Sequence, residues 1–232
     1  LWIGTQGAGL YFYDKIDKKI YSAREANPWS INITARRINQ ISVIDGKYRM
    51  ATDQGYYSIN ANGQYTELYT QKREKGLAAP HVFYGIEVNG DIWLGTDTGL
   101  YIYNYREEEL LSVSPENAYL TGLNQRYLLS GFKDSTGNVW IGSYQGLYKY
   151  NKEDSLTRVY SSKKPYQEKT DGNSIWALAE DKEQNIWFAT QSEGIGRFSF
   201  DSGIMNYYLT DHEETFWDLE IDNNGYFWIE TS

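Results

Sequence analysis

Few side chains in this sequence could perform covalent chemistry. The 232 residues include no Cys, which removes a thiolate nucleophile and any zinc site built on cysteine. The sequence also lacks a phosphate-binding G-x-x-x-x-G-K-[ST] loop, an H-E-x-x-H metal motif and a G-x-S-x-G nucleophile turn. One S-x-x-K match, Ser161 to Lys164, lies in a polar stretch typical of a solvated connection. We therefore expect no catalytic residue, no bound metal and no cofactor.

The two histidines are the remaining candidates for metal or proton chemistry. His81 and His212 each lie in a polar segment shortly before an apolar run. An imidazole can bind a metal or transfer a proton near neutral pH, but in a polar connection it is more often only solvated. We interpret His212 as a loop residue and keep His81 as a ligand-binding candidate.

Aromatic and planar polar side chains favour a binding function. The sequence has 8 Trp, 22 Tyr and 8 Phe, so 16% of its residues are aromatic. A sugar is held by flat aromatic faces beside planar hydrogen-bonding groups. Side chains of these kinds precede or begin the apolar runs, and we predict ligand-binding roles for Trp29, Arg36, Arg37, His81, Tyr84, Arg126, Tyr127, Trp176 and Trp217.

These candidates are positioned by a sequence pattern that recurs six times. Its clearest copies are LWIGTQGAGLYFYD from Leu1, DIWLGTDTGLYIYN from Asp91 and NVWIGSYQGLYKYN from Asn138. The residues that precede the Thr or Ser of each copy are Gly4, Ala51, Gly95, Gly142, Ala189 and Glu230, which is 226 residues in five steps, or about 45 per step. A regular period of this length indicates a fold assembled from copies of one unit.

Each unit reads as four short strands. The apolar run before the pattern is the first strand, predicted at Ile38–Ile44, Val82–Val88, Tyr127–Phe132, Ile175–Glu180 and Phe216–Ile221. Residues that tolerate positive φ follow, as in Asp45-Gly46 and Asn89-Gly90, and indicate a tight turn into the Trp-Ile-Gly-Thr strand. A third strand such as Leu147–Tyr150 and a fourth such as Ile204–Leu209 complete the unit, and Tyr105 to Val113 reads as a strand in preference to a helical turn.

Four antiparallel strands per repeat of this length are typical of a β-propeller blade, so the predicted fold class is all-β. We expect a single β-propeller segment over 1–232, with blade parts at 1–22 (partial), 38–69, 82–113, 126–160, 175–209 and 216–232 (partial). Both ends lie within a blade, which favours an incomplete part of a larger, seven-bladed propeller. The alternative is a five-bladed ring in which Phe216–Ile221 supplies the inner strand of the first blade.

One strand position carries a tryptophan in most copies. Because both faces of a blade are covered, we expect these side chains to pack between blades: Trp2, Trp93, Trp140, Trp187 and Trp228. The small residue after each tryptophan, such as Gly142, is expected to leave room for a neighbouring aromatic ring.

The charge and hydropathy of the chain exclude two kinds of partner. A net charge of −9 and a pI near 4.8 argue against nucleic acid. No apolar run reaches the roughly 18 residues of a membrane span, and the first residues do not read as a signal peptide. Membrane attachment is therefore expected only through segments outside this chain.

The repeats resemble the two-component regulator propeller family. The resemblance is carried by Asp134 to Ser143 followed by Gly146 to Tyr150, and by the segment from Asp171 to Asp181, and it covers essentially the whole chain. The copies depart from the family pattern at Arg49, where Trp is usual, and at Gln184 and Glu230, where Gly is usual.

The resemblance implies the periplasmic sensor region of a hybrid two-component system of Bacteroidetes. It implies an oligosaccharide ligand, a homodimer, and a transmembrane segment and histidine kinase elsewhere in the full-length protein. Two other functions compete with this one, namely a propeller lyase or hydrolase acting on a glycan, and a protein-interaction scaffold.

Overall fold

The computed structural model describes residues 1–23, 33–60, 65–69, 81–104, 109–112, 123, 127–151, 155–160, 174–211 and 214–232. These residues form strands and turns, with no α-helix among them. Within the same residues, no helix has the length and apolar character to cross a membrane. The chain divides into two compact units, unit 1 (Leu1–Ser112) and unit 2 (Val113–Ser232).

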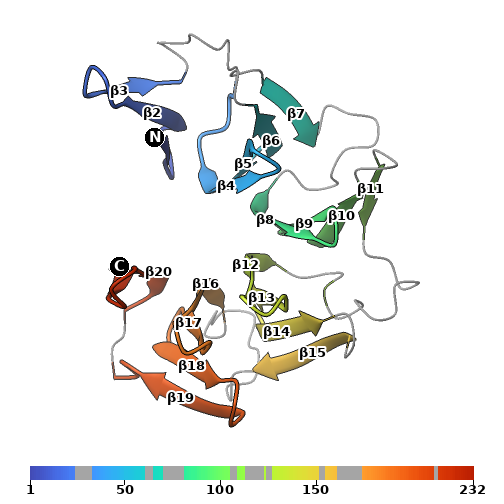
Figure 1. Cartoon of the computed structure of the whole chain (residues 1–232), viewed down its shortest axis with the longest axis vertical. Coiled ribbons are helices and arrows are strands. Elements are labelled where there is room, and N and C mark those ends of the chain that lie inside the picture. The colour runs from blue at the N-terminus through green and yellow to red at the C-terminus, as the bar shows by residue number, and fades with distance from the viewer. Residues whose placement is uncertain are drawn as a thin grey trace. The chain divides into compact units, whose positions relative to one another are not determined.

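Unit 1 contains three antiparallel sheets whose strands pair in chain order (Figure 1). The first sheet has three strands: β1 (Trp2–Gly4), β2 (Leu10–Asp14) and β3 (Lys19–Ser22). The second sheet has four: β4 (Ile38–Ile44), β5 (Lys47–Thr52), β6 (Gly55–Ile59) and β7 (Tyr65–Tyr69). The third also has four: β8 (Val82–Val88), β9 (Asp91–Thr96), β10 (Gly99–Asn104) and β11 (Glu109–Ser112).

Unit 2 repeats this organisation. One sheet of four strands contains β12 (Leu128–Lys133), β13 (Val139–Ser143), β14 (Gly146–Asn151) and β15 (Ser155–Tyr160). The next contains β16 (Ile175–Glu180), β17 (Ile186–Thr190), β18 (Ile195–Ser199) and β19 (Ile204–Tyr208). The last sheet is the pair β20 (Phe216–Ile221) and β21 (Phe227–Thr231). In this pair Phe216 lies opposite Thr231 and Ile221 lies opposite Phe227.

The predicted first strands agree closely with the observed ones. Strands β4, β8, β16 and β20 have the predicted bounds, and β12 begins one residue later than expected. Strand β11 confirms the preference for a strand within the Tyr105 to Val113 segment. The predicted all-β class, with antiparallel sheets of up to four strands, is therefore confirmed.

The turns that join a first strand to a second strand adopt two designs. In unit 1 these turns, β4–β5 and β8–β9, are two residues long, and both residues have positive φ: 51° and 68° at Asp45-Gly46, and 55° and 90° at Asn89-Gly90. Such turns match the right-handed twist of the paired strands. In unit 2 the turns are longer and place one residue at positive φ, which is Gly137 (91°), Gln184 (63°) or Gly225 (86°). Gln184 thus occupies a backbone conformation that favours glycine.

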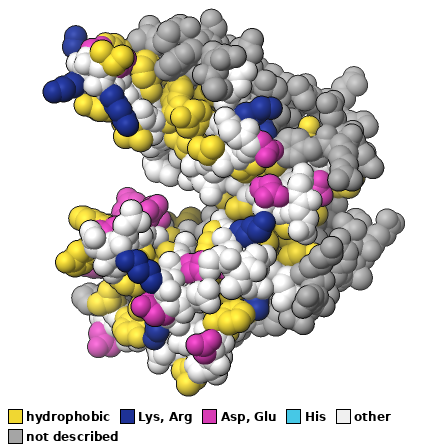
Figure 2. Space-filling view, in the orientation of Figure 1, with side chains coloured by type: hydrophobic (Ala, Val, Ile, Leu, Met, Phe, Trp, Pro, Cys, Tyr) yellow, Lys and Arg dark blue, Asp and Glu magenta, His cyan; other side chains and the backbone are white. Residues whose placement is uncertain are grey.

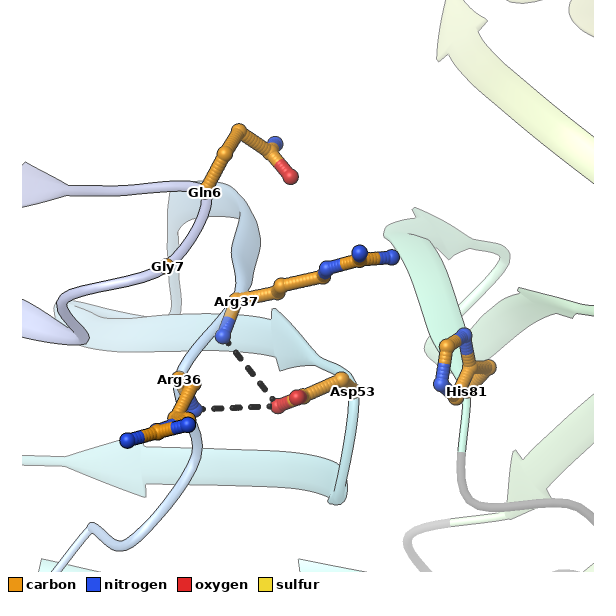
Figure 3. Close-up of a pocket in the computed structure, with 6 residues that line it drawn as sticks. All are labelled: Gln6, Gly7, Arg36, Arg37, Asp53 and His81. Carbon is orange, nitrogen blue, oxygen red and sulfur yellow. Dashed lines mark hydrogen bonds between the residues drawn. The ribbon is translucent and has the colours of Figure 1, made fainter.

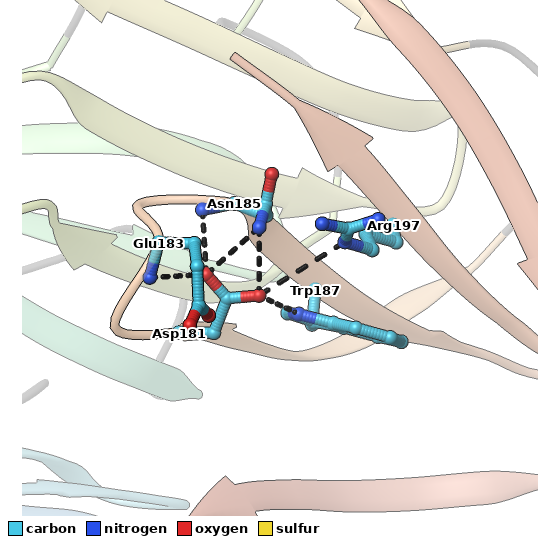
Figure 4. A network of polar contacts seen from close by, with 5 residues as sticks. All are labelled: Asp181, Glu183, Asn185, Trp187 and Arg197. Atoms are coloured by element: carbon cyan, nitrogen blue, oxygen red, sulfur yellow. Dashed lines mark hydrogen bonds and ion pairs between the residues drawn. The ribbon is translucent and has the colours of Figure 1, made fainter. Parts of the chain in front are cut away.

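An aspartate holds each of the longer turns together. Asp134 Oδ2 accepts a hydrogen bond from the Trp140 indole N–H at 2.7 Å and another from the Asn138 side chain at 2.8 Å. Asp181 repeats the arrangement with Trp187 and Asn185, as Figure 4 shows, at 2.7 Å and 2.9 Å from Oδ2. The turn thereby fixes the tryptophan that follows it in the strand.

These bonds also set the proton affinity of the turn aspartates. Burial alone would raise the pKa of Asp134 and of Asp181, but the hydrogen bonds that they accept, first from the indoles, outweigh burial and hold each pKa below its ordinary value. At the third turn the Tyr226 backbone N–H is the main cause of a lowered pKa for Asp222.

The core lies between consecutive sheets within each unit. In unit 2, fully buried Trp140 of β13 clusters with Ile175, Ile186 and Phe188 of the following sheet. This arrangement confirms the predicted inter-blade packing for Trp140. Trp228 departs from the expectation: it is 66% exposed, since no later sheet of the described residues covers β21. Figure 2 shows hydrophobic side chains at this end of unit 2.

The glycines two residues after the tryptophans allow neighbouring atoms to approach the backbone closely, although these atoms do not always belong to an aromatic ring. A Cβ on Gly95 would lie 2.0 Å from the Tyr84 ring, as expected. A Cβ on Gly142 would instead lie 2.2 Å from Ser130 Oγ and 2.7 Å from Ile175 Cγ2. The space beside Gly142 is therefore filled by its own hairpin partner and by the neighbouring sheet.

Five sheets contain a first strand, and each of these strands has a β-bulge at its second residue. In β16 the register shifts between Ile175 and Ala177, which leaves Trp176 as the extra residue. The shift between Phe216 and Asp218 does the same for Trp217 in β20. The corresponding residues of the other first strands are Asn39, Phe83 and Leu129. A bulge bends its strand and re-aims a side chain, so this device sets the direction of one residue per blade.

Candidate functional site

In unit 1, side chains from three sheets line an open depression of about 460 Å³ (Figure 3). Each lies in a loop at a strand end: two in the β1–β2 turn, two directly before β4, one in the β5–β6 turn and one directly before β8. The lining residues are Gln6, Gly7, Arg36, Arg37, Asp53 and His81.

Asp53 fixes the backbone on which the two arginines stand. Its Oδ1 accepts hydrogen bonds from the backbone N–H groups of Arg36 and Arg37, each at 3.2 Å. The Asp53 backbone N–H in turn donates to the Arg37 carbonyl at 3.1 Å. Figure 3 shows the Arg37 side chain extending across the depression toward His81, while Asp53 faces the backbone. These hydrogen bonds hold the Asp53 carboxylate against the backbone, while the Arg37 guanidinium projects into the depression.

A second acid lies next to His81. The Asp97 backbone N–H donates to the His81 carbonyl at 3.4 Å, and the Asp97 carboxylate feels the charge of His81. Burial raises the pKa of Asp97, and its interaction with His81 only partly offsets that effect. Asp97 Oδ1 is buried and makes no hydrogen bond within the described part of the chain.

In unit 2, four aromatic side chains from consecutive sheets form a continuous row. Tyr127 stacks on Tyr144 with ring centroids 4.6 Å apart and planes 13° apart. Tyr144 meets Trp176 edge to face at 6.4 Å, and Trp176 meets Trp217 in the same way at 4.8 Å. The two ends are open, since Tyr127 is 43% and Trp217 is 40% exposed. We call these four residues the aromatic row.

Two polar atoms at the aromatic row have no hydrogen-bond partner among the described residues. One is the buried indole Nε1 of Trp176, a donor, and the other is the buried Oε1 of Gln191, an acceptor. Both belong to the same end of the β16–β17 pair, where Ile175 faces Thr190 and the Gln191 backbone N–H donates to the Ser174 carbonyl. Buried polar groups normally have partners, so these two atoms are exceptions among the described residues.

The structure divides the predicted site residues between these two places. Arg36, Arg37 and His81 line the depression of unit 1, and Tyr127, Trp176 and Trp217 belong to the aromatic row of unit 2. Whether either group binds a ligand stays a prediction.

Three predicted or considered residues lie outside the described part of the chain, namely Trp29, Arg126 and His212. Tyr84 joins neither group. It is 2% exposed and its ring fills the space beside Gly95, which makes it a packing residue, and burial raises the pKa of its hydroxyl.

Sequence reasoning missed several members of the two groups. Gln6, Asp53, Tyr144 and Gln191 each directly follow the Thr or Ser of the repeated pattern. At this position the backbone N–H donates to the residue before a first strand, as from Asp53 to Arg37 and from Tyr144 to Tyr127. The repeat therefore indicates these residues in advance, because the position after Thr or Ser lies beside the predicted ligand-binding residues that precede a first strand.

Within the described residues, His, Asp and Glu side chains form no group of three or more that could hold a metal ion.

Comparison with known proteins connects the repeat to a family. Residues 171–192 match the model of the two component regulator propeller family. Comparison of the sequence with curated proteins gives no significant match.

Solved structures match the fold over almost the whole chain. The extracellular domain of the putative hybrid two component system BT3049 from B. thetaiotaomicron is 21% identical, with a TM-score of 0.72 over 99% of this chain and 30% of that chain. The corresponding domain of BT4673 is 22% identical, with a TM-score of 0.74 over 99% and 29%. Virginiamycin B lyase from Staphylococcus aureus is 15% identical, with a TM-score of 0.57 over 82% and 61%.

The chain thus spans about 30% of the length of the two extracellular domains that it resembles. At these identities the likeness shows the fold, which is that of a β-propeller. Residues 171–192 are in addition similar in sequence to the two component regulator propeller repeat.

Proposed function

We propose that this chain is part of an extracytoplasmic sensor propeller of a two-component signalling protein, and that it contributes to carbohydrate recognition. The family match and the likeness to extracellular domains of hybrid two component systems support the sensor role. The observation that carries carbohydrate recognition is the aromatic row of unit 2, with its unpaired donor and acceptor.

The row has the two properties that sugar binding requires. The C–H face of a pyranose ring is apolar and packs on an aromatic face, and the exposed rings of Tyr127 and Trp217 offer such faces. The hydroxyl groups of a sugar are donors and acceptors together, so they can satisfy both Trp176 Nε1 and Gln191 Oε1. Satisfying a buried unpaired group is worth about 1–3 kcal/mol, which favours a polar ligand over an apolar one.

In this proposal the chain has no catalytic role and works in the periplasm. The membrane segment and the kinase that would receive the signal belong to other parts of the protein, as does any contribution of a homodimer. A change in ligand occupancy would act through the relative stability of two states of the sensor.

Binding can be tested by thermal shift and calorimetry against a panel of plant, host and microbial oligosaccharides. We expect at least one neutral oligosaccharide to bind and to quench tryptophan fluorescence. Trp217→Ala should weaken it about 10-fold or more, since a stacked aromatic face contributes on the order of 1–2 kcal/mol. Trp228→Ala is the matched control, because Trp228 is an exposed tryptophan of the same sheet outside the row.

Two results would contradict the proposal. Equal binding by the Trp217→Ala and Trp228→Ala variants would remove the aromatic row as the site. Turnover of a glycan that is lost in His81→Ala would replace the sensor proposal by an enzyme.

A further inference from the structure

The depression of unit 1 is lined by two arginine side chains that form no ion pair within the described residues. The protein is acidic, with 31 Asp and Glu against 22 Lys and Arg. Even so, neither Arg36 nor Arg37 forms an ion pair with any described residue. Both stand side by side at the start of β4 and line the same depression. A guanidinium group that has no carboxylate partner favours a bound anion.

The acids near the depression do not cancel this charge. Asp53 is the only acid among the described lining residues, and its Oδ1 accepts hydrogen bonds from the backbone N–H groups of the two arginines. Asp97 lies beside His81 but does not line the depression, and burial disfavours its ionised form. The groups that project into the open space are therefore the Arg37 guanidinium and the His81 imidazole (Figure 3).

The remaining lining residues fit a ligand that carries hydroxyl groups as well as charge. Gln6 contributes a planar amide that can donate and accept, and His81 offers ring nitrogens. Gly7 adds no side chain, which leaves room above the β1–β2 turn. A space of about 460 Å³ exceeds what a small inorganic anion needs and is large enough for a sugar ring.

We infer that this depression binds the carboxylate of a hexuronic acid unit in an acidic glycan, with Arg37 as its main partner and His81 on the facing side. The inference rests on the proposed function, since it assigns a carbohydrate to the propeller. It adds a charged sugar in unit 1 to the neutral sugar expected on the aromatic row of unit 2. A guanidinium donates two parallel hydrogen bonds to a carboxylate, a geometry that lysine cannot reproduce.

The test compares three probes by calorimetry or NMR titration: methyl glucuronide, its neutral counterpart methyl glucoside, and acetate. We expect the glucuronide to bind at least about 10-fold more tightly than either of the others. Arg37→Gln should weaken the glucuronide about 10- to 100-fold, because it removes a charge-assisted pair. Lys47→Gln, which removes an exposed cation of the same unit outside the depression, should leave the affinity unchanged.

Several outcomes would overturn the inference. Equal affinity for the glucuronide and the glucoside would exclude recognition of the carboxylate, and equal affinity for acetate would exclude recognition of the sugar. Retained binding in Arg37→Gln would remove the assigned partner. Should that variant melt early, Arg37→Lys and a titration from about 0.02 to about 0.2 M salt replace it, and an affinity independent of salt would refute the ion pair.

Trp217→Ala separates this inference from the proposed function. Glucuronide binding that survives Trp217→Ala, in a protein that binds no neutral oligosaccharide, would support the depression and contradict the aromatic row. Neutral binding on the row with no glucuronide binding would support the row and contradict the depression.

Discussion

Gly142→Ala tests whether the sheets of unit 2 pack as closely as described. The added Cβ would lie 2.2 Å from Ser130 Oγ and 2.7 Å and 2.8 Å from Ile175 Cγ2 and Cβ, well inside van der Waals contact. Gly142 has no unusual φ, so the effect is steric and not conformational. Ile175 belongs to the next sheet, and Ser130 belongs to the strand paired with β13.

The expected cost has two parts. Forcing a methyl group into a filled interface costs about 1–3 kcal/mol. Moving Ser130 Oγ also breaks its 3.0 Å hydrogen bond to the Ile175 carbonyl, which contributes about 1 kcal/mol. The free energy of unfolding should fall by about 2–4 kcal/mol, or about 5–15 °C in melting temperature for a chain of this size.

Thermal and urea unfolding of three variants would measure this cost. Gly7→Ala is the control, because a Cβ there meets no atom within 4 Å, and it should melt like the parent protein. Ser130→Ala removes the nearest clashing atom, so the double variant Ser130→Ala/Gly142→Ala should lose less stability than the two single changes added together. An unchanged melt of Gly142→Ala, or strict additivity in the double variant, would refute the described packing between β13 and β16.

Two further predictions concern the long turns of unit 2. Gln184→Gly should raise the free energy of unfolding by about 1 kcal/mol, because Gln184 has a φ of 63°, and a lower melting temperature would contradict this reading. Asp134→Asn should lower the free energy of unfolding at pH 7 by about 2–3 kcal/mol, since Asp134 is 6% exposed and accepts charge-assisted bonds from Trp140 and Asn138. The pKa of Asp134 is lowered in the folded state, so its contribution is complete above about pH 4–5 and is lost as the pH falls through the lowered pKa. Urea unfolding between neutral and acidic pH should therefore show a weaker pH dependence for Asp134→Asn than for the parent, and identical slopes would argue against the bond network.

Much of the fold could be predicted because the sequence repeats one four-stranded unit several times. The apolar runs gave four first strands with their observed bounds, and the Asp-Gly and Asn-Gly pairs predicted two-residue turns with positive φ. Local rules of turn chemistry and periodicity were sufficient for these elements, because both depend on neighbours in the sequence.

The site was only partly predictable, for a physical reason. Aromatic and cationic residues near strand starts could be selected by type, but their grouping depends on which strand ends meet. The bulges that leave Trp176 and Trp217 as extra residues have no sequence signature, since they arise from a register shift against the partner strand. Tyr84 was predicted as a ligand-binding residue from its type and its position near a strand start. Its ring instead fills the space beside Gly95.

The bulge at the second residue of each first strand also has an evolutionary implication. That residue is opposite no partner of its own, so its identity is uncoupled from the pairing of the remaining strand. The blades use it differently: Asn39 donates to the Val82 carbonyl of the adjoining blade, whereas Trp176 and Trp217 supply rings to the row. A propeller built in this way can exchange one side chain per blade without rebuilding its sheets.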